Sequence, residues 1–180
     1  MAKILNHFID ICVEEMSNQM NHAHLTLLDG KMLVGRAEWC SLESLGIPVI
    51  KAKIDTGAKT SALHAMNISH HREHYKDYVT FSMNPIQGNH RVLVDCKNLI
   101  VDERVITSSN GATERRFIIE TIIVMGRDTW SILVSLSNRE PLRYRLLLGR
   151  EALRQHVLVD PSRSCVLGKI STKNALRFYG

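Results

Sequence analysis

Residues 49–61 read VIKAKIDTGAKTS, and this segment carries the most structural information in the chain of 180 residues. Its apolar and β-branched residues predict a strand that runs directly into Asp55-Thr56-Gly57. Gly57 permits a sharp turn with close approach of the backbone, and the Thr56 hydroxyl can hold that turn by hydrogen bonding. We therefore expect Asp55 at the end of a rigid strand, although an ordinary turn would explain the tripeptide equally well.

A second segment, residues 146–150, favours the more specific interpretation. It reads LLLGR, follows about ninety residues later, and precedes a short helix predicted over 151–155. In retropepsins, an apolar-apolar-Gly segment just before a C-terminal helix packs beside the Asp-Thr-Gly loop. The two segments, in this order, resemble that pattern.

Short strands separated by turn residues make up most of the chain after Gly30. Strands are expected at 31–36, 47–54, 78–83, 90–96, 99–107, 114–125, 129–136, 143–148, 157–159 and 165–168. The last two are expected to form a closing pair around Asp160-Pro161. Such spacing predicts a mainly β domain, closed or sandwiched, rather than a parallel α/β sheet.

Residues 1–28 differ from the rest, because apolar residues recur there every three to four positions with polar residues between them. This pattern predicts an amphipathic helix. We expect an N-terminal helical extension over 1–30 and one β domain over 31–180. The helix would pack on the surface of that domain, or contact a second copy or a partner.

Composition narrows the class of protein. With 44% apolar and 23% charged residues, the chain has the composition of a globular protein. No apolar run reaches the length of a membrane span, and polar residues interrupt the N-terminal segment where a secretory signal would need an apolar core. The four scattered cysteines predict buried thiols rather than disulfides. We expect a cytoplasmic protein without membrane association.

Motifs spread over residues 33–170 match one bacterial family. They are Trp39, residues 51–65, Arg115-Arg116, Asn138-Arg139, Arg143-Tyr144, residues 147–150 and residues 159–162. Together they resemble the RimB-type retropepsin-like peptidases, which often carry the label ATP-dependent zinc protease. The resemblance implies a homodimeric aspartic peptidase with a closed retropepsin-like β-barrel. It also implies that the peptidase acts together with a RimK-type ligase, which adds glutamates to a ribosomal protein, and that its substrate is a poly-α-glutamate chain.

The residues do not support the ATP and zinc of that label. No Gly-x-x-x-x-Gly-Lys-Ser/Thr motif occurs. Residues 70–74 read HHREH and satisfy the inverted zincin spacing, but that motif needs a helix and a third ligand. The polar stretch 69–77 predicts an exposed connection or a hairpin tip instead. We expect no cofactor and no metal.

An aspartic peptidase needs two carboxylates that share a proton. Only one Asp-Thr-Gly occurs, and Asp160 precedes a proline that fits a turn better. The second carboxylate must then be Asp55 of another copy. The predicted catalytic residues are Asp55, Thr56 and Gly57, and the predicted scaffold consists of Ala58, Leu148, Gly149 and Arg150.

Basic residues in the matching segments favour an acidic substrate. Lys51 and Lys53 alternate along one strand and share a face with Asp55, and Lys59 follows the turn. The predicted substrate-binding residues are Lys51, Lys53, Lys59, Arg115, Arg116, Arg139 and Arg143. A flap should close over the substrate, formed by 79–96 with its tip at 85–89, or by the turn at 108–113.

Two other functions stay open. One is a non-catalytic retropepsin-like module that binds acidic tails or the ligase, and the other is a zinc-dependent peptidase. The net charge of +5 by itself selects neither an acidic ligand nor a nucleic acid. A nucleic-acid partner is disfavoured, because only 6% of the residues are aromatic and few of them lie among the basic residues.

Overall fold

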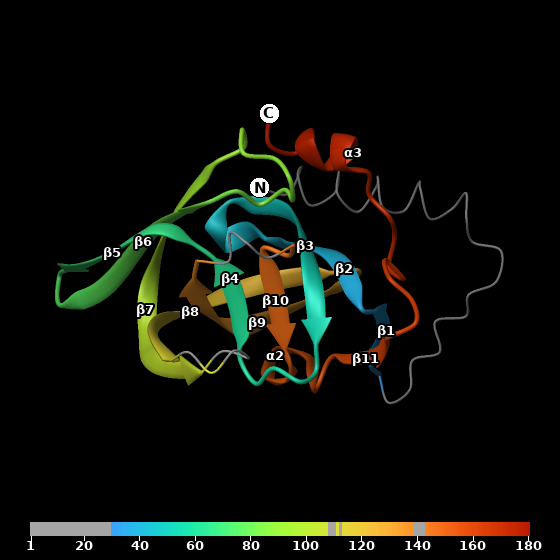
Figure 1. The fold of residues 1–180 in the computed structure, drawn as a ribbon, viewed down its shortest axis with the longest axis horizontal. Helices are drawn as coiled ribbons and strands as arrows, with labels where there is room; N and C mark the ends of the chain where they lie inside the picture. Colours follow the sequence, from blue (N-terminus) through green and yellow to red (C-terminus); the bar gives the residue numbers. More distant parts are fainter. Residues whose placement is uncertain (1–29, 108–110, 112, 139–142) are drawn as a thin grey trace.

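The protein is mainly β, and the computed structural model describes residues 30–180 apart from 108–110, 112 and 139–142 (Figure 1). The helix expected within 1–30 and the side chain of Arg139 lie outside the described residues. None of the helices in the described part is long and apolar enough to cross a membrane.

Strands dominate the order of elements along the chain. They are β1 (Met32–Gly35), β2 (Ala37–Leu42), β3 (Ile47–Asp55), β4 (Ser61–His64), β5 (Met66–Glu73), β6 (Lys76–Met83), β7 (Val94–Thr107), β8 (Thr113–Met125), β9 (Asp128–Ser137), β10 (Leu146–Gly149) and β11 (Val157–Asp160). The helices of the described ranges are short: η1 (Glu43–Leu45), α2 (Arg150–Leu153) and, after the last strand, α3 (Thr172–Leu176).

Six strands close into a barrel in the order β2-β3-β10-β4-β9-β8, and β8 returns to β2 at the pair Val124 and Ser41. The barrel is mixed, because β10 runs parallel to β3 and β4 runs parallel to β9, while the other neighbours are antiparallel. β10 therefore separates β3 from β4, although these two follow one another in sequence (Figure 1). The prediction of a mainly β, closed retropepsin-like barrel is confirmed.

The core forms because strand residues alternate between the barrel interior and its outer side. Along the second half of β3, Ile50, Ala52 and Ile54 are buried, whereas Lys51, Lys53 and Asp55 remain partly exposed. The largest fully buried side chains include Leu42, Ile47, Leu63, Phe81, Ile119, Ile123 and Leu136. Asp55 thus lies on the outer side of a strand whose inner side is fixed by apolar packing.

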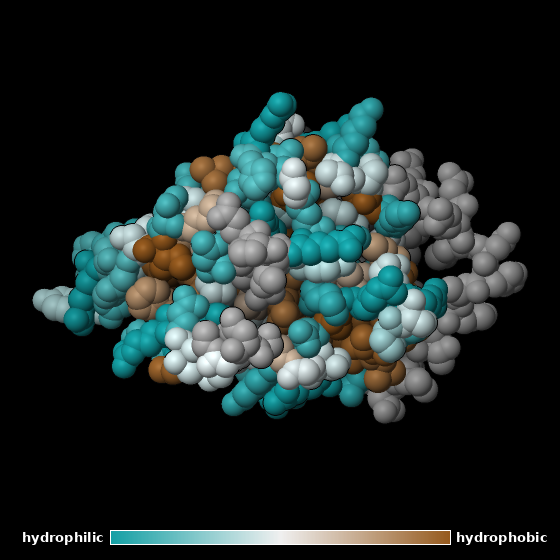
Figure 2. Space-filling model, in the orientation of Figure 1, coloured by the Kyte–Doolittle hydropathy of each residue, from teal (hydrophilic) through white to brown (hydrophobic). Residues whose placement is uncertain are grey.

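Strands β5, β6 and β7 continue the sheet beyond the barrel as an arm (Figure 1). β5 and β6 form a hairpin that turns at His74 and Tyr75, both with positive φ, of 48° and 64°. Hydrophilic side chains cover the tip of this arm (Figure 2). The expected hairpin tip within 69–77 is therefore present, on two strands that the sequence pattern did not predict in full.

Of the closing strand pair expected at 157–159 and 165–168, only the first strand is present, and the prediction of a strand at 165–168 is wrong. β11 pairs in parallel with β1 instead, and Cys165 has a φ of 54°, which a strand residue does not adopt. The backbone N–H groups of Val166 and Leu167 donate to the buried carboxylate of Glu38, at 2.8 and 3.3 Å. Residues 165–168 are thus held by the Glu38 side chain and by the carbonyl of Ala37, which accepts from the N–H of Cys165 at 2.8 Å, and not by pairing with β11.

The C-terminal segment ends in a helix that was not predicted. Ser171 precedes α3 and its Oγ accepts a hydrogen bond from the N–H of Asn174 at 3.2 Å, as an N-cap does. Ala175 of α3 and Ile170 pack against Val49 of β3 and Ile86. This small cluster lies outside the barrel core, at the start of β3.

Gly149 ends β10 directly beside Asp55, its register partner in β3. A Cβ atom at Gly149 would lie 2.7 Å from the carbonyl carbon of Thr60 and 2.8 Å from the carbonyl oxygen of Lys59. Only a residue without a side chain permits this approach between β10 and the loop that follows Asp55.

Gly149→Ala should therefore destabilise the fold. Backbone atoms would have to move to accommodate the methyl group, and such overpacking costs about 1–3 kcal/mol of the free energy of unfolding. Urea denaturation measures the loss. Gly180→Ala is the matched control, because no atom lies within 4 Å of the new Cβ; equal stabilities for the two variants would contradict the prediction.

Glu38 gives the stability a specific pH dependence. Burial raises the pKa of its carboxyl, and this outweighs the hydrogen bonds from the N–H groups of Gly35, Val166 and Leu167, which lower it. The folded state thus binds more protons than the unfolded chain, and the contribution of Glu38 to stability falls as pH rises above its ordinary pKa of 4.5.

Glu38→Gln removes this titration. We expect the free energy of unfolding of the wild type, minus that of Glu38→Gln, to decrease from mildly acidic to mildly alkaline pH. Urea denaturation of both proteins at matched ionic strength gives the difference. A difference that stays constant or grows with pH would show that the carboxyl is not destabilised by burial.

Candidate active site

Asp55 is the last residue of β3, and a short loop connects it to β4. Its Oδ1 accepts hydrogen bonds from the backbone N–H groups of Gly57 at 3.1 Å and of Ala58 at 3.2 Å. Within the described residues, Oδ2 of Asp55 accepts no hydrogen bond. The loop therefore orients the carboxylate through one oxygen and leaves the other available to a ligand or a second protein chain.

The carbonyl groups of this loop are bound from the opposite direction by the start of α2. The carbonyl oxygen of Gly57 accepts from Nη1 of Arg150 at 2.9 Å, and that of Ala58 accepts from the backbone N–H of Arg150 at 2.8 Å. The next carbonyl, of Lys59, accepts from the N–H of Glu151 at 3.2 Å. The first N–H groups of a helix have no partner within the helix, and here the Asp55 loop satisfies two of them.

Ser61 adds a contact that sequence reasoning missed. Its buried hydroxyl accepts a hydrogen bond from the N–H of Gly149 at 3.1 Å, which ties β10 to the end of the same loop. Ser61 belongs to the block that resembles the peptidase family, but an isolated serine after a turn carries no signal for this role.

On its other side, the end of β3 is held by residues 35–38. The N–H of Ile54 donates to the carbonyl of Arg36 at 3.0 Å, and the N–H of Arg36 donates to the carbonyl of Arg163 at 2.8 Å. A Cβ at Gly35 would lie 2.7 Å from the same Arg163 oxygen. Residues 162–167 therefore support β3 through this turn, an arrangement that the sequence did not predict.

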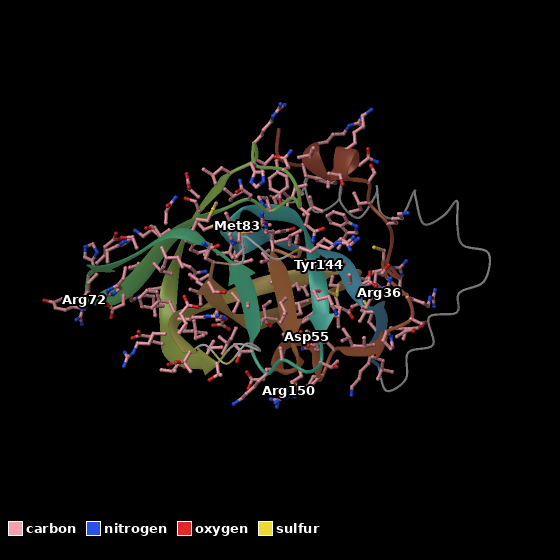
Figure 3. All side chains as sticks on the ribbon, viewed as in Figure 1. Arg36, Asp55, Arg72, Met83, Tyr144 and Arg150 are labelled. Atoms are coloured by element: carbon pink, nitrogen blue, oxygen red, sulfur yellow. The ribbon has the colours of Figure 1, made fainter. Side chains whose placement is uncertain are left out.

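Three charged side chains lie close to the loop. Lys53 is partly exposed on the same side of β3 as Asp55, as predicted, and its Nζ donates to the carbonyl of Ile54 at 3.0 Å. Lys59 is exposed, and its Nζ lies 3.9 Å from the carboxylate of Glu151, a residue that the sequence analysis missed. Arg150 lies at the same end of the barrel as Asp55 (Figure 3).

Three other predicted substrate-binding residues contact side chains outside the Asp55 loop. Lys51 lies two residues further from it along β3, with Nζ 5.5 Å from the centre of the Trp39 ring. Arg115 is 3.5 Å from Glu103, and Arg116 is 2.8 Å from Glu114, so each has a carboxylate partner within the β7–β8 hairpin.

Arg143 lies 5.8 Å from the ring of its neighbour Tyr144 and precedes β10 at the end opposite Gly149. Arg139 is outside the described residues. The structure thus brings together Asp55, Thr56, Gly57, Ala58, Lys59, Leu148, Gly149 and Arg150, with Lys53 beside them.

The two flap candidates lie in different places. In the first, the tip at 85–89 contains Ile86, which packs against Val49. Val49 is six residues before Asp55, so this tip lies about 20 Å away along β3. In the second, the β7–β8 hairpin comes closer, because Nη1 of Arg104 lies 4.0 Å from Glu151 at the start of α2. The turn of that hairpin falls partly outside the described residues.

Residues 70–74 do not form the helix that a zincin requires. They lie on β5 and its turn, where His70 bonds to Asp77 at 2.8 Å and Glu73 to Lys97 at 2.7 Å. The two histidines of the motif are His70, on the strand, and His74, in the turn with a φ of 48°, so the helical spacing that would place both on one face is absent. Across the described ranges, no group of three His, Cys, Asp or Glu side chains is arranged to hold a metal ion.

Comparison with known proteins places the chain among the peptidases. The model of the retropepsin-like aspartic endopeptidase RimB family matches residues 33–169. A "Probable alpha-L-glutamate ligase" of Shewanella pealeana is 41% identical over 152 residues, which are 84% of this chain and 33% of the relative. The protein of the same name from Desulfotalea psychrophila is 40% identical over 149 residues, 83% of this chain and 32% of the relative.

This chain therefore spans about a third of the length of these relatives. Among solved structures, the crystal structure of the Legionella pneumophila protein Lpg0085, of unknown function, is similar with a TM-score of 0.64 and 27% identity. The match covers 75% of this chain and 97% of that one. With three quarters of its length matched by one family model, the chain belongs to the RimB-like family of retropepsin-like aspartic endopeptidases.

Proposed function

We propose that this endopeptidase is active as a homodimer, in which Asp55 of each copy supplies one of two catalytic carboxylates. The observation that carries the proposal is the Asp55 loop. It is held by hydrogen bonds on both sides, yet it leaves Oδ2 of Asp55 and the exposed Thr56 without a partner in the described part of the chain.

The chemistry requires the second carboxylate. Two carboxylates a few ångströms apart cannot both ionise easily, so the pair holds one proton. The ionised member accepts a proton from water, whose oxygen attacks the carbonyl carbon of the scissile bond, while the protonated member donates a hydrogen bond to the carbonyl oxygen. The C–N bond then breaks and the leaving amine takes up a proton. A single Asp55 can perform only one of these two roles.

Thr56 supports a dimer at this position. Its side chain is exposed at the outer end of the loop, beyond Asp55, where a second loop related by a two-fold axis would meet it. In this arrangement Thr56 would bond across the axis, while Gly57 supplies the backbone turn.

The substrate we propose is a chain of α-linked glutamates, such as the tail that a RimK-type ligase adds to a ribosomal protein. Lys53 lies on the same outer side of β3 as Asp55, Arg150 binds the Gly57 carbonyl, and Lys59 belongs to the loop, where it lies near Glu151, so three basic residues are on or next to the Asp55 loop. The name of the relatives, "Probable alpha-L-glutamate ligase", fits this charge, because one long chain would then join the synthesis of glutamate chains to their hydrolysis. A RimK-type ligase is accordingly the proposed partner.

Mixing experiments should reveal the dimer. Asp55→Asn removes one carboxylate, and at equal concentrations half of the wild-type chains would pair with the variant. We expect the activity per wild-type chain to fall to about half, and towards zero with excess variant. Activity is measured on an α-linked oligoglutamate, with and without a chelator. If added variant left the activity per wild-type chain unchanged, a site shared between two copies would be rejected. If the chelator abolished the activity, a zinc-dependent peptidase would be favoured.

Charge reversal at Lys53 tests the substrate class. Lys53→Glu should raise KM for an oligoglutamate by about tenfold or more, because a repulsive charge replaces an attractive one beside the scissile bond. Added salt should weaken wild-type cleavage as well, since exposed charges are screened. Lys76→Glu, at the distant arm, is the matched control. Equal effects of the two variants, or salt-independent turnover, would contradict electrostatic selection.

A further inference from the structure

The last twenty residues of the chain form a second basic region. Residues 161–180 contain Arg163, Lys169, Lys173 and Arg177, and no Asp or Glu. All four side chains are exposed, and none forms an ion pair with a described residue. We call these four residues the basic segment.

Packing directs these charges towards solvent. Ala175 and Ile170 face the small cluster at the start of β3, while Lys173 and Arg177 are four residues apart along α3, one turn, and share another side. Two like charges at this spacing repel each other unless a ligand neutralises them. α3 and the 84–93 loop lie together at the top of the molecule, where hydrophilic side chains project outward (Figures 1 and 2).

The C-terminal residues next to the basic segment contact the start of β3, the strand that ends at Asp55. The Tyr179 hydroxyl bonds to the carbonyl of Val49 and accepts from its N–H at 3.4 Å. Trp39 packs against the same cluster, and its ring is the one that Lys51 approaches. Trp39 and Lys51 are register partners, so they project on one side of the β2–β3 pair.

Lys51, Lys53 and Asp55 follow one another on that side with a period of two residues. An extended peptide has the same period, so alternate carboxylates of a glutamate chain would recur about every 7 Å, as the two lysines do. The path from Asp55 to Val49 is about 20 Å long, which about six extended residues cover.

We infer that the basic segment is an exosite that binds the distal part of an acidic peptide chain, with Lys53 and Lys51 along the path from Asp55. This inference rests on the proposed function, and it adds that long tails are preferred over short ones. A peptide fits better than a nucleic acid, because single strands bind through exposed aromatic rings, whereas Trp39, Phe178 and Tyr179 are packed into the cluster.

The test measures binding to the full chain carrying Asp55→Asn, which prevents cleavage. The probes are fluorescent α-linked oligoglutamates of about four and about twelve residues, chosen to fall short of and to exceed the path. Lys173→Gln/Arg177→Gln is compared with Arg72→Gln/Lys76→Gln on the arm. Each pair lowers the net charge of +5 by two, to +3.

We expect the first pair to weaken binding of the long probe about fivefold, as for two exposed ion pairs, and the control pair to leave it nearly unchanged. The short probe should bind with the same affinity to the parent and to both pairs of variants. Equal binding of the short probe also shows that the variants are folded. Equal losses in both pairs, or no dependence on length, would overturn the exosite. The exosite would also be overturned if a single-stranded RNA bound the parent protein more tightly than the long probe does, and if Lys173→Gln/Arg177→Gln weakened binding of both.

Cleavage by the chain with Asp55 intact separates the two proposals. If it hydrolyses oligoglutamates but binding shows no dependence on length, the exosite is rejected and the peptidase function stands. If the exosite binds as expected but neither length is hydrolysed, the proposed function is rejected and the binding site stands.

Discussion

The site depends on a two-sided set of backbone hydrogen bonds around the Asp55 loop. From inside the turn, Asp55 binds the N–H groups of Gly57 and Ala58. From outside, Arg150 and Glu151 bind three successive loop carbonyls. A loop whose N–H and C=O groups are satisfied in this way needs no burial to be rigid, so the carboxylate can be well oriented and still accessible.

This arrangement requires a barrel with an unusual strand order. β10 must lie between β3 and β4 for Gly149 to stand beside Asp55, and a helix must begin at once so that its first N–H groups face the loop. The LLLGR segment therefore has three functions in five residues: two apolar residues fill the core, a glycine allows close approach, and an arginine reaches Gly57. Residues 162–167 support the opposite side of β3 through Arg36 and Glu38.

The parts that could be predicted from sequence are those with a strong local pattern. Asp55-Thr56-Gly57 and the LLLG segment could each be an ordinary strand end or turn, but their order in the chain and the family resemblance joined them into one predicted site. The roles of Ser61 and Glu38 could not be predicted, because their hydrogen-bond partners Gly149 and Val166 lie 88 and 128 residues away in the sequence. β5 was missed because its residues 69–73 are all polar, which removes the apolar-polar alternation that marks a strand. Arg115 and Arg116 were matched by motif, but motif alone does not reveal that Glu103 and Glu114 bind them.

The position of β10 also constrains how the chain reaches its native state. β3 and β4 are complete by residue 64, yet the strand that joins them ends at residue 149. Until then each has an unsatisfied edge that can recruit a strand from another molecule. Closing a loop of this length is entropically costly and slows folding, so the nascent protein passes through a state prone to association. The same insertion that orients the carboxylate thus leaves the facing edges of β3 and β4 open until β10 is in place.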